Sequence, residues 1–421
     1  MKDIQVPLFH MVMCLSNAVD LVSPTLDDHH KRTSFIATSI AEEMGLSDAE
    51  QMDVLMAGAM HDIGAISFTE NLDSLWFDTD NPQLHAEMGF RHIRTFKPFA
   101  SAADLVRFHH VRWEHGAGER FQGCEVPAGS HIIHLADRVD MLTNRRDPVP
   151  AQLSGICDEL ETLSGTVYMP EAVSAFRSLS KRKAFWLDAT SRTINRVLFR
   201  RAGKESFDLD MDGILNMAMM FARIIDFRSR FTALHSGGVA ACAYTLAESM
   251  GLSDEECKMI RVAGYMHDIG KLAIPREILE KPARLTEEEL HVVKCHPYYT
   301  HRVLDSIDGL ELINSWASFH HERLDGTGYP FCREEKNLPL GSRIVAVADV
   351  FTALTEDRPY RAGMTPEVAL EHLKDMAADH AVDAEVVGML AANFCQMDDV
   401  RKIAQYVEYL EYQEFSDTVL V

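Results

Sequence analysis

Histidines and aspartates recur at wide intervals in the second half of this chain. The set consists of His235, His267, Asp268, His296, His320, His321 and Asp349. Neutral imidazole nitrogens suit first-row transition metals, and the two oxygens of an aspartate can bridge two cations. Because the set exceeds what one ion can use while leaving room for a substrate, it predicts two ions ~3.5–4 Å apart, bridged by Asp268.

The same pattern of residue types occurs in the first half of the chain. Its members are His29, His61, Asp62, His85, His109, His110 and Asp137, with the adjacent His30 as an alternative to His29. Corresponding members lie 206 residues apart at the start of the pattern and 211 or 212 apart at its end. This shared register predicts an internal duplication, and therefore two copies of one fold unit.

Composition narrows the class of protein. A chain of 421 residues that is 47% hydrophobic and 25% charged is expected to form two soluble domains with a connector. The net charge of −23 argues against a broad nucleic-acid partner, which needs a basic face. No apolar run approaches the ~18 residues of a membrane span, and the start lacks the features of a secretory signal. Eight scattered cysteines without a C-x-x-C pair favour a reducing cytoplasm.

Helix signals also repeat in both halves. Gly45 and Gly251 are predicted to end helices, and each is followed by a capping box that opens the next one. The boxes are Ser47 with Glu50 and Ser253 with Glu256, and Thr286 with Glu289 forms a further one. Strand-like alternation is nearly absent, so we expect an all-α protein.

Three motifs of the second half carry a resemblance to a known family. They are His-Asp-Ile-Gly-Lys at 267–271, His-His-Glu-Arg-Leu-Asp-Gly-Thr-Gly-Tyr-Pro at 320–330 and Arg-Pro-Tyr-Arg at 358–361. Over about 230–365 the chain resembles the HD-GYP family. The resemblance implies two tandem HD-type helical bundles joined by a helical connector. The expected boundaries are 1–148 for a divergent HD domain, 149–206 for the connector and 207–421 for the HD-GYP domain with its C-terminal helices.

The resemblance implies that the protein is a metal-dependent phosphodiesterase. Members hydrolyse bacterial cyclic dinucleotides, so 3′,3′-cyclic GMP-AMP or cyclic di-GMP is the expected substrate, cleaved by a metal-bridged hydroxide to a linear 5′-phosphorylated dinucleotide. The tandem arrangement resembles the members that act on cyclic GMP-AMP. Iron or manganese is the expected metal, with nickel or zinc as alternatives. In the family the Gly-Tyr-Pro loop also contacts proteins of the diguanylate-cyclase type, which adds a candidate partner.

Individual roles follow from the same resemblance. Lys271 and Asp268 are expected in catalysis, with Lys271 neutralising charge on the phosphoryl oxygens. The substrate is expected to meet Lys271, Tyr329, Arg358 and Arg361. Some members hold a third metal through a glutamate one turn before the first histidine. Here that place is Phe231, which favours a two-metal site.

The first copy departs further from the family. Ala65 stands where the second copy has Lys271, and the stretch near Gly116 to Arg120 lacks a Gly-Tyr-Pro motif, although Arg146 matches Arg358 in register. Three interpretations stay open. This copy is a metal-loaded regulatory domain, a second hydrolase that removes the 5′-phosphate from the linear product, or a metal-free packing domain. For the whole chain, the alternative to an enzyme is a non-catalytic module that binds a nucleotide or a partner.

Overall fold

The computed structural model describes residues 4–22, 28–67, 82–145, 147–203, 207–227, 234–357 and 362–419. The chain divides into two compact units. The N-terminal unit comprises Pro7–Phe207, and the C-terminal unit comprises Asp208–Val421 together with Met1–Val6. The domain boundaries expected from the sequence stay a prediction.

The N-terminal unit is built from helices, 3-10 turns and one short hairpin. In chain order its elements are α1 (Leu8–Asp20), α2 (His29–Met44), α3 (Asp48–Met60), η2 (Ile63–Ser67), α4 (Pro82–Ile93), η4 (Lys97–Phe99), α5 (Ala100–Arg107), η5 (Glu114–Glu119), β2 (Arg120–Phe121), β3 (Cys124–Glu125), α6 (Ala128–Leu142), η6 (Val149–Ala151), α7 (Leu153–Thr162), α8 (Pro170–Ser180), α9 (Lys183–Ala189) and α10 (Ile194–Ala202). The helices α7 to α10 lie in the range expected for the connector and belong to the N-terminal unit, where α8 and α10 pack against α2.

The C-terminal unit is likewise built mainly from helices. Its elements are β4 (Asp208–Leu209), α11 (Met211–Asp226), α12 (His235–Ser249), α13 (Asp254–Met266), η7 (Ile269–Ala273), α14 (Arg276–Leu279), α15 (Glu287–Val293), α16 (His296–Leu304), α17 (Glu311–Ser318), η8 (Glu335–Asn337), α18 (Leu340–Thr355), α19 (Pro366–Ala378), α20 (Ala384–Ala392) and α21 (Phe394–Val419). The strand β1 (Val6–Pro7) completes the described elements. The predicted all-α fold is confirmed, because each strand in the described part has only two residues.

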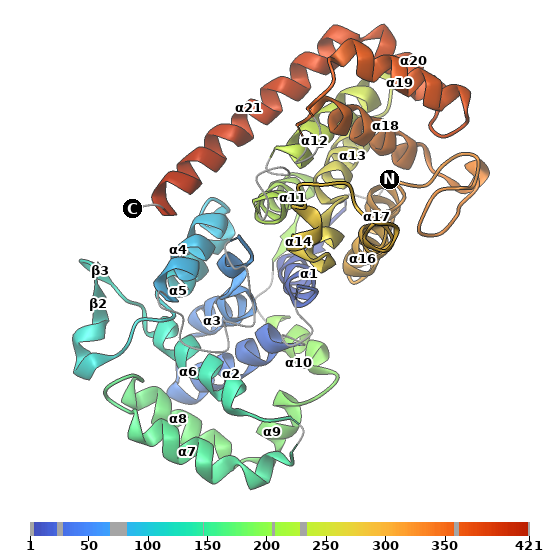
Figure 1. Cartoon of the computed structure of the whole chain (residues 1–421). Helices are drawn as coiled ribbons and strands as arrows, with labels where there is room; N and C mark the ends of the chain where they lie inside the picture. Colours follow the sequence, from blue (N-terminus) through green and yellow to red (C-terminus); the bar gives the residue numbers. More distant parts are fainter. Residues whose placement is uncertain are drawn as a thin grey trace. The chain divides into compact units, whose positions relative to one another are not determined.

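One central helix organises each unit (Figure 1). In the N-terminal unit α2 packs against α3 and α6, and in the C-terminal unit α12 packs against α13 and α18. The long helix α21 also packs along α12. Both central helices begin with a predicted metal-binding histidine, so the packing of each bundle places that residue in its interior.

The predicted helix signals are confirmed where the structure describes them. Capping boxes form at Ser47, Ser253 and Thr286, each with its glutamate three residues later. Gly45 and Gly251 adopt left-handed backbone conformations with φ of 77° and 80°, which an L side chain would strain. After each glycine the chain turns into the helix that ends directly before the His-Asp pair, which is α3 in one unit and α13 in the other.

Close backbone contact fixes α16 against the turn after the His-Asp pair. A Cβ atom on Gly270 would lie 2.0 Å from the carbonyl oxygen of His296 and 2.5 Å from the backbone nitrogen of Thr300. The corresponding contact in the N-terminal unit joins Gly64 to His85 and Gly89. Both turns thus depend on glycine to bring a predicted ligand histidine close to the His-Asp pair. In the part of the chain that the structure describes, no helix is both long and apolar enough to cross a membrane.

We expect Gly270→Ala to lower the unfolding free energy by about 1–3 kcal/mol, because the added methyl group must push two packed backbones apart. Chemical denaturation of the variant and the unaltered protein measures this. Gly388→Ala is the matched control, since Gly388 is exposed in α20 with no atom near its Cβ position, and it should leave stability unchanged or raise it. Equal behaviour of the two variants would contradict the proposed tight contact.

Candidate metal centres

The His-Asp pair of the C-terminal unit lies at the end of α13. His267 Nδ1 donates a hydrogen bond to the carbonyl oxygen of Gly264 at 2.7 Å, which leaves Nε2 as the ring nitrogen available to a metal ion. That nitrogen is buried and has no hydrogen-bond partner among the described residues. His61 Nε2 of the N-terminal unit is in the same situation. Buried polar atoms normally have a partner, and a metal ion would supply one here.

Other imidazoles are oriented in the same way. Each donates from Nδ1 to the carbonyl oxygen three residues earlier, at 2.6–3.0 Å; they are His61, His109, His296 and His320. Histidines that bind metals commonly use the second ring nitrogen in this manner, which fixes the tautomer. Burial, reinforced by the neighbouring His321, lowers the pKa of His296 to about 3 and keeps the ring in the neutral form that binds metals.

Asp268 lies between two groups of imidazoles. Its Oδ2 is 3.1 Å from His267 Nε2 and 3.7 Å from His235 Nε2. Its Oδ1 is 3.3 Å from His296 Nε2, which in turn is 3.2 Å from His320 Nε2. One carboxylate therefore faces two places where an ion fits, one through each oxygen.

Asp349 closes the first of these places. Its Oδ1 is 3.1 Å from His235 Nε2 and 3.9 Å from His267 Nε2, and its Oδ2 is 3.8 Å from His321 Nδ1. One group thus comprises His235, His267, Asp268 and Asp349, and the other adds His296, His320 and His321. The structure brings together all seven residues of the second half that the sequence singled out.

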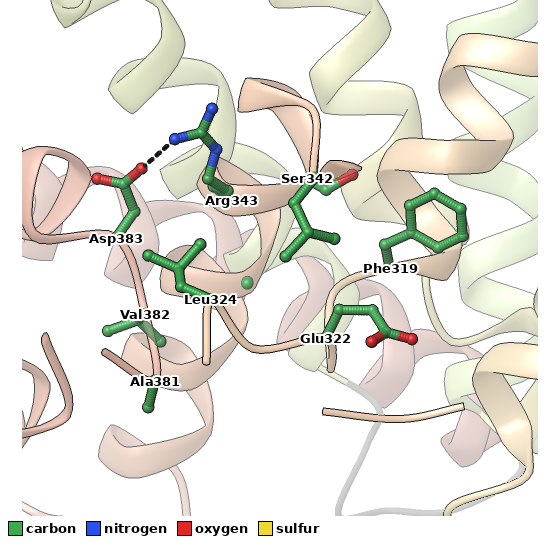
Figure 2. A pocket seen from close by; sticks show the side chains of 10 residues that line it. Phe319, Glu322, Leu324, Ser342, Arg343, Ala381, Val382 and Asp383 are labelled. Atoms are coloured by element: carbon green, nitrogen blue, oxygen red, sulfur yellow. Dashed lines mark hydrogen bonds and ion pairs between the residues drawn. The ribbon is translucent and has the colours of Figure 1, made fainter. Parts of the chain in front are cut away.

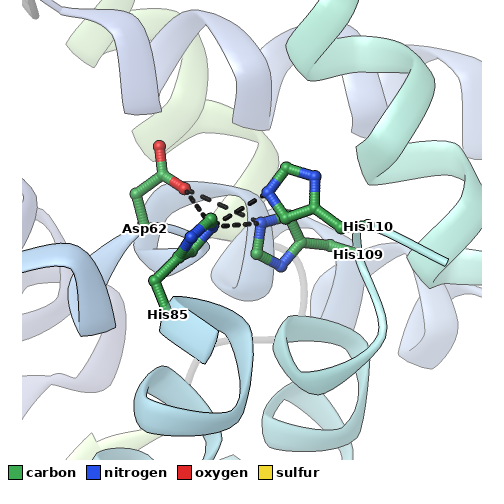
Figure 3. Close-up of side chains that lie close together, drawn as sticks. All are labelled: Asp62, His85, His109 and His110. Carbon is green, nitrogen blue, oxygen red and sulfur yellow. Dashed lines mark hydrogen bonds and ion pairs between the residues drawn. The ribbon is translucent and has the colours of Figure 1, made fainter. Parts of the chain in front are cut away.

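The N-terminal unit repeats the arrangement. Asp62 Oδ2 is 3.2 Å from His61 Nε2 and 3.8 Å from His29 Nε2. Its Oδ1 is 3.4 Å from His85 Nε2 and 3.7 Å from His109 Nε2. Figure 3 shows Asp62 facing His85 and His109, with His110 beside them.

Asp137 and both adjacent histidines also reach the N-terminal cluster. Asp137 Oδ1 is 3.3 Å from His29 Nε2, while His30 Nε2 is 3.9 Å from Asp62 Oδ2. His30 Nδ1 lies 3.2 Å from Asp20 Oδ1. His29 thus takes the position of His235, and His30 is an additional imidazole with no counterpart in the C-terminal unit, where Ser236 follows the first histidine.

These donor sets fit divalent metal ions. In each unit, imidazole nitrogens and carboxylate oxygens converge on one buried place, and several of these candidate donor atoms lie within 4.8 Å of one another. Imidazole with carboxylate is a donor combination of first-row metals such as iron, manganese and zinc. Both units can therefore hold metal.

Lys271 distinguishes the C-terminal cluster from the N-terminal one. Its ammonium group pairs with Asp268 Oδ2. Burial alone would raise the pKa of Asp268, but His267 and Lys271 hold it well below the usual value, so the carboxylate stays ionised. Ala65, the residue in register with Lys271, is buried and apolar, so the N-terminal cluster has no ammonium group at this position.

The Gly-Tyr-Pro segment lies beside the C-terminal cluster. The Tyr329 ring is 4.9 Å from the His321 ring between centroids, and the Lys294 ammonium group is 5.3 Å from the centroid of Tyr329. Buried Glu322 anchors the segment by accepting hydrogen bonds from the backbone N–H groups of Phe331 at 2.7 Å and Arg333 at 2.8 Å. Tyr329 is therefore held next to a predicted ligand.

Behind the anchored segment lies a small pocket (Figure 2). Glu322 and Phe319 line it together with the Arg343–Asp383 ion pair, whose nitrogen and oxygen are 2.8 Å apart. This ion pair joins α18 to the turn before α20.

Some predicted residues lie outside the part that the structure describes. These are Arg358 and Arg361, predicted to contact the substrate, together with Arg146 and Phe231. Their roles stay predictions.

Sequence analysis missed the carboxylates that hold the first histidine of each set. His29 Nδ1 lies 2.8 Å from Asp140 Oδ2, and His235 Nδ1 lies 2.9 Å from Glu356 Oε2. Asp140 had a local signal, because it lies three residues after Asp137 on α6. Glu356 had none, since it occupies a different place in the repeat.

Comparison with known proteins identifies the class that this fold and these clusters define. The HD domain family matches residues 219–386 and, separately, residues 26–142. The chain belongs to the HD-GYP family of HD-domain phosphodiesterases and has two HD domains in tandem.

Two relatives from Vibrio cholerae match over nearly their whole length. The 3′3′-cGAMP-specific phosphodiesterase 1 is 31% identical over 401 residues, which covers 90% of each chain. The 3′3′-cGAMP-specific phosphodiesterase 3 is 31% identical over 422 residues, 88% of this chain and 91% of the relative. A crystal structure of a cyclic GMP-AMP-specific phosphodiesterase of V. cholerae has the same fold, with a TM-score of 0.66 at 23% identity over 93% of this chain and 98% of the other.

A third relative matches a shorter part. The cyclic di-GMP phosphodiesterase response regulator RpfG of Xanthomonas campestris pv. campestris is 42% identical over 154 residues, which covers 36% of this chain and 41% of the relative.

We expect His320→Ala to lower the amount of metal bound per chain, because Nε2 of this buried ring faces the second group of donors. Metal analysis of the purified protein by atomic spectroscopy measures the change. His291→Ala is the matched control, because this exposed histidine of α15 lies outside the cluster and should leave the metal content unchanged. Equal metal content in both variants would contradict the assignment of His320.

Proposed function

We propose that the C-terminal unit hydrolyses 3′,3′-cyclic GMP-AMP to a linear 5′-phosphorylated dinucleotide, with cyclic di-GMP as the second candidate substrate. The observation that carries this proposal is the donor cluster around Asp268, with Lys271 and Tyr329 at its edge. A pair of bound divalent ions would make a water molecule acidic enough to act as nucleophile near neutral pH. We propose two such ions, iron or manganese, held by His235, His267, Asp268, His296, His320, His321 and Asp349.

The residues around the cluster would orient the substrate. The Lys271 ammonium group is a compact charge next to Asp268, suited to a phosphoryl oxygen on which negative charge develops. The Tyr329 ring offers a stacking face for a base, and Arg358 and Arg361 are proposed to bind phosphate or a base edge. A non-catalytic binding module would have little need for a lysine beside a complete set of ligands.

The relatives favour cyclic GMP-AMP over cyclic di-GMP. Two relatives named for 3′3′-cGAMP extend over both HD domains of this chain, whereas the cyclic di-GMP relative RpfG matches only 154 residues. Another 3′3′-cGAMP-specific relative matches a shorter part, 161 residues. The direct comparison of both substrates is therefore the experiment that decides.

We expect the manganese- or iron-loaded protein to convert cyclic GMP-AMP faster than cyclic di-GMP, as followed by chromatography of the linear product. Lys271→Met should lower kcat by about 10²–10³, because it removes a charge that acts on the transition state. Lys336→Met, at an exposed lysine that pairs with Glu334, is the control and should retain activity. Absence of linear product from either substrate by the metal-loaded protein would remove the proposed function.

We further propose that the N-terminal unit removes the 5′-phosphate from the linear product. The supporting observation is that Asp62 has the same relation to its imidazoles as Asp268, while Ala65 leaves the cluster without the lysine. Without this ammonium group, the cluster suits a reaction in which negative charge develops at a different place from that in the reaction of the C-terminal unit. The alternative is that the metal-loaded N-terminal cluster has a regulatory role.

We also propose that the Gly-Tyr-Pro segment of the C-terminal unit binds a protein of the diguanylate-cyclase type.

We expect the double variant His61→Ala with Asp62→Ala to lose about half of the bound metal and to accumulate the 5′-phosphorylated dinucleotide from cyclic GMP-AMP. Metal analysis and product chromatography measure the two effects. The unaltered protein should release inorganic phosphate from the same product. Phosphate release that persists at the same rate in the double variant would contradict the phosphatase role, and unchanged metal content would contradict metal binding by this unit.

A further inference from the structure

The first histidine of each cluster is held differently from the histidines that donate a hydrogen bond to a backbone carbonyl group. Whereas His267 and His320 donate from Nδ1 to a backbone carbonyl group, His29 and His235 direct Nδ1 at a carboxylate. A carboxylate partner fixes the ring and strengthens the opposite nitrogen as a metal ligand. The two units use carboxylates from different places in the repeat.

In the N-terminal unit the holding group is local to the bundle. Asp140 of α6 faces His29 with Oδ2, and Arg32 of α2 donates to the same carboxylate from Nε at 2.6 Å and from Nη2 at 3.1 Å. Arg32 lies three residues after His29 on the same helix. The His29–Asp140–Arg32 arrangement is buried throughout.

The C-terminal unit has lost both of these groups. In the register of the duplication, Gly238 corresponds to Arg32 and Thr352 corresponds to Asp140. Thr352 is fully buried and carries no charge. Neither residue can supply the carboxylate or the cation that the N-terminal unit uses.

Two residues from other places restore the arrangement. Glu356 lies four residues after Thr352, one helical turn later, and its Oε2 is 2.9 Å from His235 Nδ1. Its other oxygen accepts a hydrogen bond from Gln405 Nε2 at 2.5 Å. Gln405 belongs to α21, beyond the 219–386 segment that matches the HD domain family.

The missing side chain at Gly238 makes room for this contact. A Cβ atom there would lie 3.1 Å from Gln405 Nε2 and 3.0 Å from Thr352 Cγ2. Gln405 is itself fixed, because its Oε1 accepts a hydrogen bond from Arg401 Nη1 at 2.7 Å, and Arg401 pairs with Asp398 at 2.5 Å. The place of the arginine side chain is thus taken by a glutamine from another helix.

We propose that Glu356 and Gln405 are positioning residues for His235, and that the C-terminal helix α21 is thereby part of the metal centre of the C-terminal unit. The inference rests on the proposed function only in taking His235 as a metal ligand. In both units the carboxylate that orients the first ligand belongs to the bundle, but in the C-terminal unit this carboxylate is held in turn by Gln405 of α21.

The test is the rate at which the loaded, full-length protein loses manganese to a chelator. Glu356→Gln should lose the ions of the C-terminal unit about 10-fold faster or more, as for other groups that orient metal-binding histidines. Gln405→Met keeps the length of the side chain without its hydrogen bond and should lose them severalfold faster. Gln396→Ala, at an exposed position of the same helix, is the control and should match the unaltered protein.

Rescue separates positioning from a general loss of stability. Thr352→Asp added to Glu356→Gln returns a carboxylate to the place that Asp140 occupies in the other unit, so it should restore slow metal loss. Metal loss at the unaltered rate in Glu356→Gln and Gln405→Met would overturn the proposal, as would a rescue variant that folds but still loses metal fast. If Glu356→Gln does not fold, Gln405→Met decides by itself.

The outcome is distinguishable from failure of the proposed function, because metal loss is measured without substrate. Fast metal loss in the variants of a protein that cleaves neither cyclic dinucleotide would support the positioning role and remove the phosphodiesterase. Normal cleavage of a cyclic dinucleotide, with an unchanged rate of metal loss in every variant, would support the phosphodiesterase and remove the positioning role.

Discussion

In both units an ionised aspartate faces two groups of imidazoles through its two oxygens, and the rest of each bundle follows from this placement. Asp268 is buried and carries a negative charge that is costly without cations nearby. The bundle therefore brings helices α12, α13, α16 and α18 to one place, where their histidines and Asp349 surround it. The glycine turn after Asp268 and the hydrogen bonds from the histidine rings to the backbone also hold these groups in position.

The two copies have diverged around a preserved cluster. The N-terminal unit retains Arg32 and Asp140 behind its first histidine and has an additional imidazole, His30. The C-terminal unit has instead gained Lys271, the Gly-Tyr-Pro segment and the contact with α21. Of these features, Lys271 is positive and Tyr329 is aromatic, and both lie at the edge of the cluster, where the phosphate and base of the proposed dinucleotide substrate would meet them.

The sequence predicted the all-α fold and the residues of both clusters, because ligand types and helix caps leave local signals that the duplication repeats. It did not predict the partner of His235, since the contact between Glu356 and Gln405 depends on how α21 packs on α12. Nothing near Gln405 marks it as functional. In the register of the duplication Thr352 stands where the N-terminal unit has Asp140, and the packed structure shows that Glu356, one helical turn later, contacts the histidine instead.

Anomalous diffraction from crystals grown with manganese addresses the central claim most directly. Two peaks ~3.5–4 Å apart on either side of the Asp268 carboxylate, one near His235 and the other near His320, are what shared ligation requires. A single peak, or peaks that leave Asp268 without contact to metal, would contradict the account.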